Sequence, residues 1–224
     1  LTGKQGFQGN LSSNEILNQF RSIPEFRKLT NIVYMGMGEP LDNLDEVIKS
    51  LEILTGLWGY GWSPTRITVS TIGLKNQVRE FLERSRCHLA VSLHSPFDEE
   101  RSRLMPIQKT NNIREILEII RTADLNSQRR ISFEYILFKG INDTPQHVQE
   151  LARLLNGIKC RINIIRFHTI PGSEFTSPSL QEAEGFRDIL NKKGILATVR
   201  RSRGEDIGAA CGLLSTRAMN KQAE

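Results

Sequence analysis

Residues 130–167 read RISFEYILFKGINDTPQHVQELARLLNGIKCRINIIRF, and the order of patterns in this stretch decides the class of fold. Its two mostly apolar runs, 130–138 and 161–167, are rich in Ile and Phe, which is typical of strands buried on both faces. Between them, Thr144-Pro145 is a typical helix start and Gly157 a typical helix end. The order strand, helix, strand predicts a βα unit of a parallel sheet.

The same alternation extends over the rest of the chain. Four more apolar runs predict strands at 31–36, 66–71, 88–94 and 195–201. Between the runs, apolar residues recur at helical spacing in two segments, which predicts two helices. The first set is Leu44, Val47, Ile48, Leu51 and Leu54, and the second is Ile113, Ile116, Leu117 and Ile120. A capping box of Ser12 and Glu15 predicts one helix near the start, and Ser177-Pro178 and Gly194 bracket the last one. A doubly wound open sheet and a full or partial (β/α) barrel both fit this α/β pattern.

Length, composition and charge set the limits of the interpretation. The 224 residues are 38% hydrophobic and 25% charged, and they show no linker, so we expect a single domain over 1–224. No apolar run is long enough to span a membrane, and the first residues show no secretory signal. Lys and Arg number 30 against 25 Asp and Glu, a net charge of +5 that permits a nucleic-acid partner without requiring one.

The three cysteines, Cys87, Cys160 and Cys211, are far apart in the sequence. This spacing predicts neither a disulfide framework nor a zinc site, and it favours a reducing compartment. Cys87 and Cys160 border predicted strands, where small buried thiols are common. Cys211 lies instead among Ala209, Ala210 and Gly212, the smallest side chains available.

Small or ionisable residues follow four of the predicted strands. These residues are Gly36, Gly38 and Glu39 in MGMGEP, Ser70 and Thr71 in the second run, Ser92 and His94 in the third, and Arg166 and His168 in the fifth. The carboxyl ends of parallel strands meet at one edge of the sheet. These residues therefore predict a ring of ligand-binding groups at that edge. The glycine spacing matches neither a dinucleotide fingerprint nor a P-loop, so we expect the glycines to admit a ligand close to the backbone, with Glu39 accepting from an amine. Mid-strand Glu134 fits either a barrel lumen or a buried hydrogen-bonded position.

Six segments together resemble one family, the radical-SAM RNA methyltransferases of the RlmN/Cfr group. They are TGKQGFQGNLSSNEI, YMGMGEPLDN, RITVSTIGL, LAVSLHSPFDEERSRLMPI, FEYILFKGINDTPQHV and RRSRGEDIGAACG. The resemblance implies a partial (β/α)6 TIM-like barrel, expected here without its first strand and its CxxxCxxC loop. In the family that loop binds a [4Fe–4S] cluster, and the cluster binds S-adenosylmethionine. We therefore expect the cluster ligands to lie upstream of Leu1, the chain to be an inactive fragment, and no residue of the chain itself to bind metal.

The resemblance also assigns cofactor contacts to residues of this chain. Gly38 and Glu39 match the element that holds the methionine amine of the cofactor. The other positions that it implies as cofactor contacts are Ser70, Ser92, Leu93, His94 and His168. His168 stands where many members have asparagine, and Gly208 stands where an acidic residue is common.

Cys211 matches the methyl-carrier cysteine of the family. The resemblance implies that this thiol is methylated and that a radical from a second cofactor molecule activates the S-methyl group to attack adenine. The implied substrates are position 2 of an adenine in 23S rRNA and in tRNA, with a cytoplasmic, monomeric full-length enzyme. Methylation of position 8, as in the Cfr branch, and a non-catalytic cluster-free RNA-binding module are the alternatives. An ordinary TIM-type hydrolase or lyase would need metal ligands at the strand ends, and the sequence does not place them there.

Overall fold

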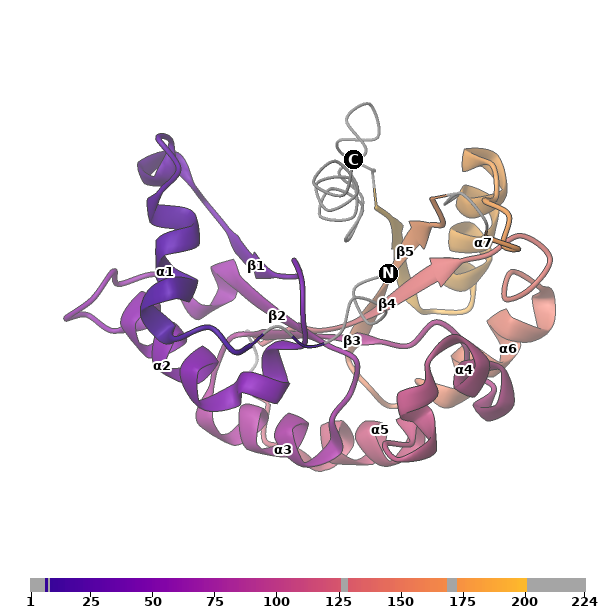
Figure 1. Cartoon of the computed structure of the whole chain (residues 1–224). Helices are drawn as coiled ribbons and strands as arrows, with labels where there is room; N and C mark the ends of the chain where they lie inside the picture. The colour runs from indigo at the N-terminus through magenta and orange to yellow at the C-terminus, as the bar shows by residue number, and fades with distance from the viewer. Residues whose placement is uncertain (1–6, 8, 126–128, 169–172, 201–224) are drawn as a thin grey trace.

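The structure is a computed structural model that describes residues 7, 9–125, 129–168 and 173–200. Six parallel strands form one curved sheet in the order of the chain (Figure 1). They are β1 (Ile32–Tyr34), β2 (Ile67–Thr71), β3 (His88–Ser92), β4 (Ile131–Leu137), β5 (Cys160–Arg166) and β6 (Leu196–Val199). All six predicted strands are present. A doubly wound sheet reverses its strand order at one point, and this sheet does not, so the partial barrel is confirmed.

Helices line the outer, convex side of the sheet (Figure 1). The α-helices are α1 (Ser13–Arg21), α2 (Leu44–Thr55), α3 (Lys75–Arg84), α4 (Asp98–Leu104), α5 (Ile113–Thr122), α6 (Pro145–Leu154) and α7 (Leu180–Lys192). Four short 3-10 helices, η2 (Phe26–Lys28), η3 (Pro40–Asn43), η4 (Pro64–Arg66) and η5 (Pro106–Lys109), lie in the connections. Every apolar residue that predicted α2 and α5 is buried, because these residues form the helix faces turned toward the sheet.

The helix starts show one correct prediction and two corrections. Ser12 and Glu15 form the predicted capping box of α1. Helix α7 begins at Leu180 rather than after Ser177, because Ser179 and Glu182 form a second capping box there. Thr144 precedes α6 as predicted, but its hydroxyl contacts His147 Nδ1 at 2.7 Å and makes no capping bond to the backbone.

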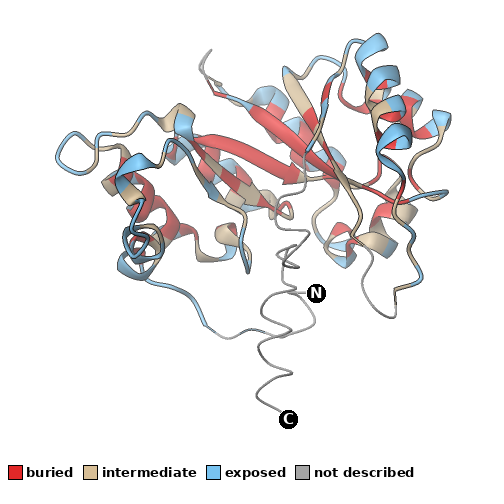
Figure 2. Ribbon diagram, turned by 90° about the horizontal axis from the view of Figure 1, so that it is seen from above, coloured by how far each residue is buried: buried red, intermediate tan, exposed pale blue. Residues whose placement is uncertain are grey.

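The two faces of the sheet differ in chemistry. Outward-facing side chains such as Ile67, Val69 and Phe133 pack under the helices and are fully buried. The inner face of the curve, which we call the lumen, carries polar side chains at alternate positions, among them Thr68 and Ser132. In Figure 2 the burial is concentrated in the strands and the sheet-facing sides of the helices. No described helix combines the length and the apolar character needed to cross a membrane.

Candidate functional site

The loop after β1 carries the first predicted site residues. Gly38 has a φ of +81°, a conformation that favours glycine, and a Cβ placed there would meet open space. Glu39 caps η3, and its carboxylate accepts hydrogen bonds from two backbone N–H groups, Leu41 at 3.0 Å and Ile72 at 2.7 Å. The carboxylate therefore ties the β1 loop to the end of β2. The Thr71 side chain also hydrogen-bonds to this carboxylate, which leaves one further lone pair for a ligand amine.

Burial raises the pKa of Glu39, and the hydrogen bonds from Ile72 and its neighbours oppose this shift. A half-buried carboxylate with two backbone donors is held in one orientation. Glu39 is therefore a positioned acceptor rather than a mobile surface charge.

Ser70 and Ser92 present hydroxyls on the lumen face at the ends of β2 and β3. Both are half-buried, and within the described residues neither hydroxyl has a hydrogen-bond partner. The following residues fix the local backbone, since Thr71 Oγ1 accepts from Gly73 N at 3.0 Å and Gly73 has a φ of +97°. The two hydroxyls therefore remain available to a ligand that lies across the strand ends.

His94 occupies an unusual backbone conformation for a non-glycine residue, with a φ of +57°. It lies at the centre of a tight turn in which Ser95 N donates to Leu93 O at 2.7 Å. Its Nδ1 accepts a hydrogen bond from Ile136 N on β4 at 3.0 Å. Burial, and then the charge of Arg101, lower the pKa of His94 to about 3. The neutral ring therefore carries its hydrogen on Nε2, which can donate to a ligand.

Leu93 contributes through its backbone. Its side chain is fully buried, its N–H donates to Glu134 O at 2.9 Å, and its carbonyl accepts from Ser95 N and from Arg101 Nε. Leu93 thus anchors the turn that presents Ser92 and His94.

Arg101 is a residue that the sequence interpretation missed. Its side chain is fully buried, and its guanidinium donates to three backbone carbonyls at the strand ends, which are Leu93 O (3.1 Å), Ser92 O (2.9 Å) and Ile72 O (3.3 Å). Burial lowers the pKa of Arg101 to about 10, so the group stays charged at neutral pH. One side chain from α4 therefore holds the ends of β2 and β3 in a fixed relation.

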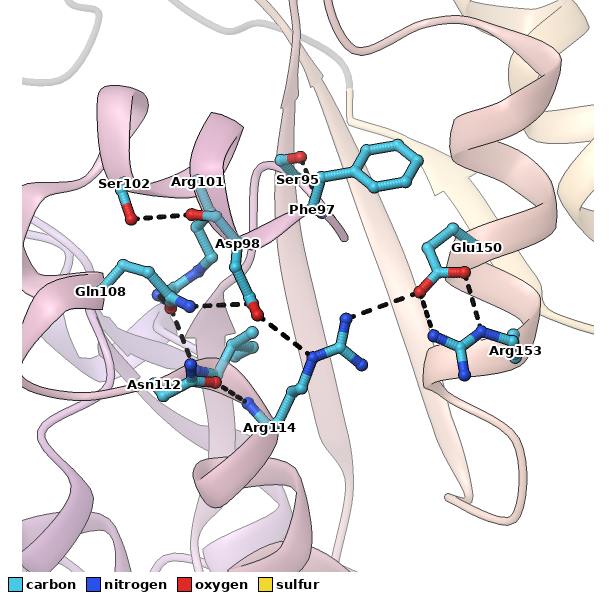
Figure 3. Close-up of polar contacts among 11 residues, drawn as sticks. Ser95, Phe97, Asp98, Arg101, Ser102, Gln108, Asn112, Arg114, Glu150 and Arg153 are labelled. Carbon is cyan, nitrogen blue, oxygen red and sulfur yellow. Dashed lines mark hydrogen bonds and ion pairs between the residues drawn. The ribbon is translucent and has the colours of Figure 1, made fainter.

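A polar network behind the site supports this arginine (Figure 3). Arg101 Nη1 donates to Gln108 Oε1, which also accepts from Ile113 N at 3.0 Å. Gln108 Nε2 in turn donates to Asp98 Oδ1 at 3.0 Å. In Figure 3 the chain of contacts continues outward through Arg114 to Glu150 on α6. These contacts limit the rotation of the Arg101 guanidinium.

Asn142 is a second missed residue, and it connects β3 with β4. It is fully buried, and its amide donates to His94 O and to Ile136 O, both at 2.7 Å. Its side-chain oxygen accepts from Phe138 N at 2.7 Å. Asn142 therefore fixes the strained His94 turn from the β4 side. From sequence alone, Asn142 has the composition of an ordinary turn residue.

The remaining predicted residues differ in how far the structure places them. His168 is half-buried and follows β5 by two residues, at the same carboxyl edge. Cys211 lies outside the described residues. The structure therefore brings Gly38, Glu39, Ser70, Ser92, Leu93, His94 and His168 to one edge of the sheet.

The described cysteines lie elsewhere. Cys87 is buried, and burial raises the pKa of its thiol. Burial raises the pKa of Cys160, at the amino end of β5, to about 11. Within the described ranges no three His, Cys, Asp or Glu residues cluster as a metal site. These residues therefore do not fit a [4Fe–4S] cluster, which needs closely spaced thiolates.

Comparison with known proteins identifies the family. The profile of the Radical SAM superfamily matches residues 2–155, more than half of the chain. The chain belongs to the radical SAM superfamily. Membership implies S-adenosylmethionine and a [4Fe–4S] cluster as the cofactors. Half-buried serine hydroxyls and an open glycine loop are suitable groups for the polar parts of S-adenosylmethionine.

Relatives of this radical SAM chain carry a consistent name. "Probable dual-specificity RNA methyltransferase RlmN" of Parabacteroides distasonis is 58% identical over 96% of the chain, and that of Porphyromonas gingivalis strain W83 is 60% identical over 96%. "Dual-specificity RNA methyltransferase RlmN" of Campylobacter jejuni is 46% identical over 97%. The chain spans 63% of the length of each of these relatives. The predicted resemblance to the RlmN/Cfr group is thereby confirmed.

Solved structures agree with the assignment of this radical SAM chain. A radical SAM methyltransferase from Sphaerobacter thermophilus is 40% identical with a TM-score of 0.87, and the match covers 94% of this chain and 64% of that one. A domain of pyruvate-formate lyase-activating enzyme from Bacteroides vulgatus, 21% identical with a TM-score of 0.55 over 77% of this chain and 100% of that one, supports the fold alone.

Proposed function

We propose that the protein containing this chain is a radical S-adenosylmethionine-dependent RNA methyltransferase that methylates position 2 of an adenine in 23S rRNA and in tRNA. The observation that carries the proposal is the 58% identity, over 96% of the chain, to a relative named a dual-specificity RNA methyltransferase. The arrangement of polar groups at one edge of the sheet supports it independently.

The carboxyl ends of the strands would hold S-adenosylmethionine. When bound, this cofactor supplies the methyl group and the precursor of the radical. Ser70 and Ser92 offer hydroxyls that have no hydrogen-bond partner in the described part of the chain, and His94 offers its Nε2–H. Glu39 has the geometry to accept from the methionine amine while it holds the Gly38 loop. Leu93 would position its neighbours, and His168 would donate a hydrogen bond from the β5 end.

Cys211 would carry the methyl group as an S-methylcysteine. Ala209, Ala210 and Gly212 leave room around the thiol, and Arg201 and Arg203 would bind RNA phosphates. We also infer that residues 1–224 form one domain of a cytoplasmic enzyme that is monomeric at full length. Size-exclusion chromatography of that enzyme with light scattering would report a dimer if this inference is wrong.

The test uses the full-length protein, reconstituted anaerobically and incubated with S-adenosylmethionine and either RNA. Mass spectrometry of the digested RNA is expected to find 2-methyladenosine. Cys211→Ala is expected to abolish formation of 2-methyladenosine without changing the iron content. The matched variant Cys160→Ala is expected to form the product normally. Cys160 lies at the opposite, amino end of β5 and serves as the control thiol.

Three results would contradict the proposal. Formation of 8-methyladenosine would move the protein to the Cfr branch. RNA binding by a protein that takes up no iron and forms no methylated product would favour the non-catalytic, cluster-free module. Normal product formation by Cys211→Ala would remove the carrier role from Cys211.

A further inference from the structure

A cavity of about 270 Å³ opens into the lumen of the barrel. Its lining comes from all six strands or their immediate ends and consists of Val33, Met35, Thr68, His88, Arg130, Ser132, Arg161, Asn163, Thr198 and Arg200. None of these is among the predicted cofactor residues. Thr68 precedes Ser70 by two positions and His88 precedes Ser92 by four, so at the central strands the cavity lies toward the amino ends. At the two edge strands it also reaches Met35 and Arg200, which follow the carboxyl ends of β1 and β6. We call it the lumen floor.

The lumen floor carries an excess of positive charge. Arg130, Arg161 and Arg200 line it, and within the described residues none of the three forms an ion pair. Arg200 Nη1 lies 3.6 Å from Met35 Sδ, a contact that joins the two edge strands across the lumen. His88 adds no charge, because its Nδ1 accepts from Arg130 N at 3.0 Å and its pKa is lowered, first by burial and then by Arg130. Three arginine side chains therefore line one cavity.

A buried carboxylate with one unused oxygen lies beside this charge. Glu134 is 4% exposed, and its Oε1 accepts from Asn163 Nδ2 at 2.7 Å and, more weakly, from Ser132 Oγ at 3.5 Å, both of which line the cavity. Its Oε2 is buried without a hydrogen-bond partner among the described residues. A buried carboxylate oxygen without a donor is costly, so a donor from a ligand would stabilise it.

These features together select the ligand. Guanidinium groups pair well with oxyanions, and an anion of charge −2 balances three cations and one carboxylate. The unused Oε2 of Glu134 requires a ligand that also donates a hydrogen bond. Hydrogenphosphate has both properties, because its P–OH donates while its other oxygens accept. Sulfate is fully ionised at neutral pH and has no hydrogen to donate.

We propose that the lumen floor binds a phosphate group that carries one proton, with the guanidinium groups of Arg130, Arg161 and Arg200 on its oxygens and Glu134 accepting from its P–OH. Arg130 and Arg200 are exposed, so the site has access to solvent. The ligand is inorganic hydrogenphosphate, because a phosphate monoester has a second pKa of about 6 and has lost its P–OH proton at neutral pH. A phosphodiester within RNA has no P–OH and is excluded by the same argument as sulfate.

The experiment is a calorimetric titration of the full-length protein in phosphate-free buffer at constant ionic strength, pH 7.5. Inorganic phosphate, sulfate, 5′-AMP and adenosine are the four probes. We expect saturable binding of phosphate and at least tenfold weaker binding of sulfate. 5′-AMP is a dianion without a P–OH at this pH, so it is expected to bind at least tenfold more weakly than phosphate, and adenosine is expected not to bind. Binding of 5′-AMP as tight as that of phosphate would overturn the proposal.

Three variants test whether phosphate binds through the residues of the lumen floor. Arg161→Gln is expected to weaken phosphate binding at least tenfold, whereas the matched Arg79→Gln on the outer face of α3 leaves it unchanged. Glu134→Gln presents an amide that can donate, so it is expected to bind sulfate as tightly as phosphate. Glu134→Gln keeps the side-chain volume, so it tests the proposal by itself if Arg161→Gln fails to fold.

The competing explanation is that Arg161 or Arg200 turns to pair with Glu134 in solution. In that case neither anion binds at millimolar concentration, and the proposal is wrong. Equal binding of phosphate and sulfate by the unmodified protein would also overturn it, as would a Glu134→Gln variant that still discriminates.

Discussion

The carboxyl edge of the sheet and the lumen floor are both polar, but they use their polar groups differently. At the edge, the side chains of Glu39, Arg101 and Asn142 hydrogen-bond to backbone groups at the ends of neighbouring strands. At the floor, the guanidinium groups of Arg130 and Arg161 form no ion pair among the described residues. Glu134, which pairs with Ser92 and accepts from the floor residue Asn163, has no described donor at Oε2. The edge is thus held in one geometry by its own side chains, whereas the floor keeps binding capacity for a ligand.

At the edge itself, the residues that hold the backbone in place are different from the residues that can bind a ligand. The buried groups orient the backbone, and the groups left for a ligand are few, chiefly the hydroxyls of Ser70 and Ser92 and the Nε2 of His94. Substitutions of the first kind should alter stability most, and substitutions of the second kind should alter ligand affinity with little change in stability.

The largest expected effect is that of Arg101→Met. It removes the arginine donor from Ser92 O and Ile72 O and one of the two donors from Leu93 O, and each unsatisfied buried group costs about 1–3 kcal/mol. We expect the free energy of unfolding to fall by about 3 kcal/mol or more, measured by denaturant titration of the full-length protein. Arg103→Met, an exposed position in the same helix, is the control and should change it by less than about 0.5 kcal/mol. Equal effects of the two substitutions would show that the carbonyl contacts contribute nothing.

The next effect is the pH dependence of stability through His94, which near neutral pH is smaller than the effect of Arg101→Met. Its pKa is lowered from 6.5 in the unfolded chain to about 3 in the folded protein, so the unfolded state binds the proton more readily between these values. Stability contributed by the neutral ring is complete above pH 6.5 and is lost as the pH falls toward 3, with a slope of up to about 1.4 kcal/mol per pH unit. His94→Gln should flatten the pH profile of unfolding in this window. If the free energy of unfolding of His94→Gln changes with pH as steeply as before, groups other than His94 cause the pH dependence.

Much of the fold could be predicted from the sequence, because its signals are local. The apolar run 130–138 and the helical spacing from Leu44 to Leu54 each specify an element and its buried face. The shared edge of Glu39, Ser70 and Ser92 also follows, since parallel strands end on the same side. Cys211 stays a prediction because it lies outside the described residues.

Residues whose role depends on distant contacts could not be predicted in this way. Arg101 lies in DEERSR, which has the composition of a solvated helix face, yet it reaches carbonyls from two strands. The adjacent pair Arg129 and Arg130 looks like one basic group, but the structure separates them. Arg129 is buried and donates to Leu82 O, whereas Arg130 lines the lumen floor.

The central claim is that S-adenosylmethionine binds at the carboxyl edge and not at the lumen floor. The most direct test is the affinity of the full-length, cluster-loaded protein for S-adenosylmethionine in two matched variants, Ser92→Ala at the edge and Ser132→Ala at the floor. Loss of one hydrogen bond of about 1 kcal/mol should weaken binding about fivefold in Ser92→Ala, with no change in Ser132→Ala. Weaker binding in Ser132→Ala with an unchanged Ser92→Ala would contradict the account.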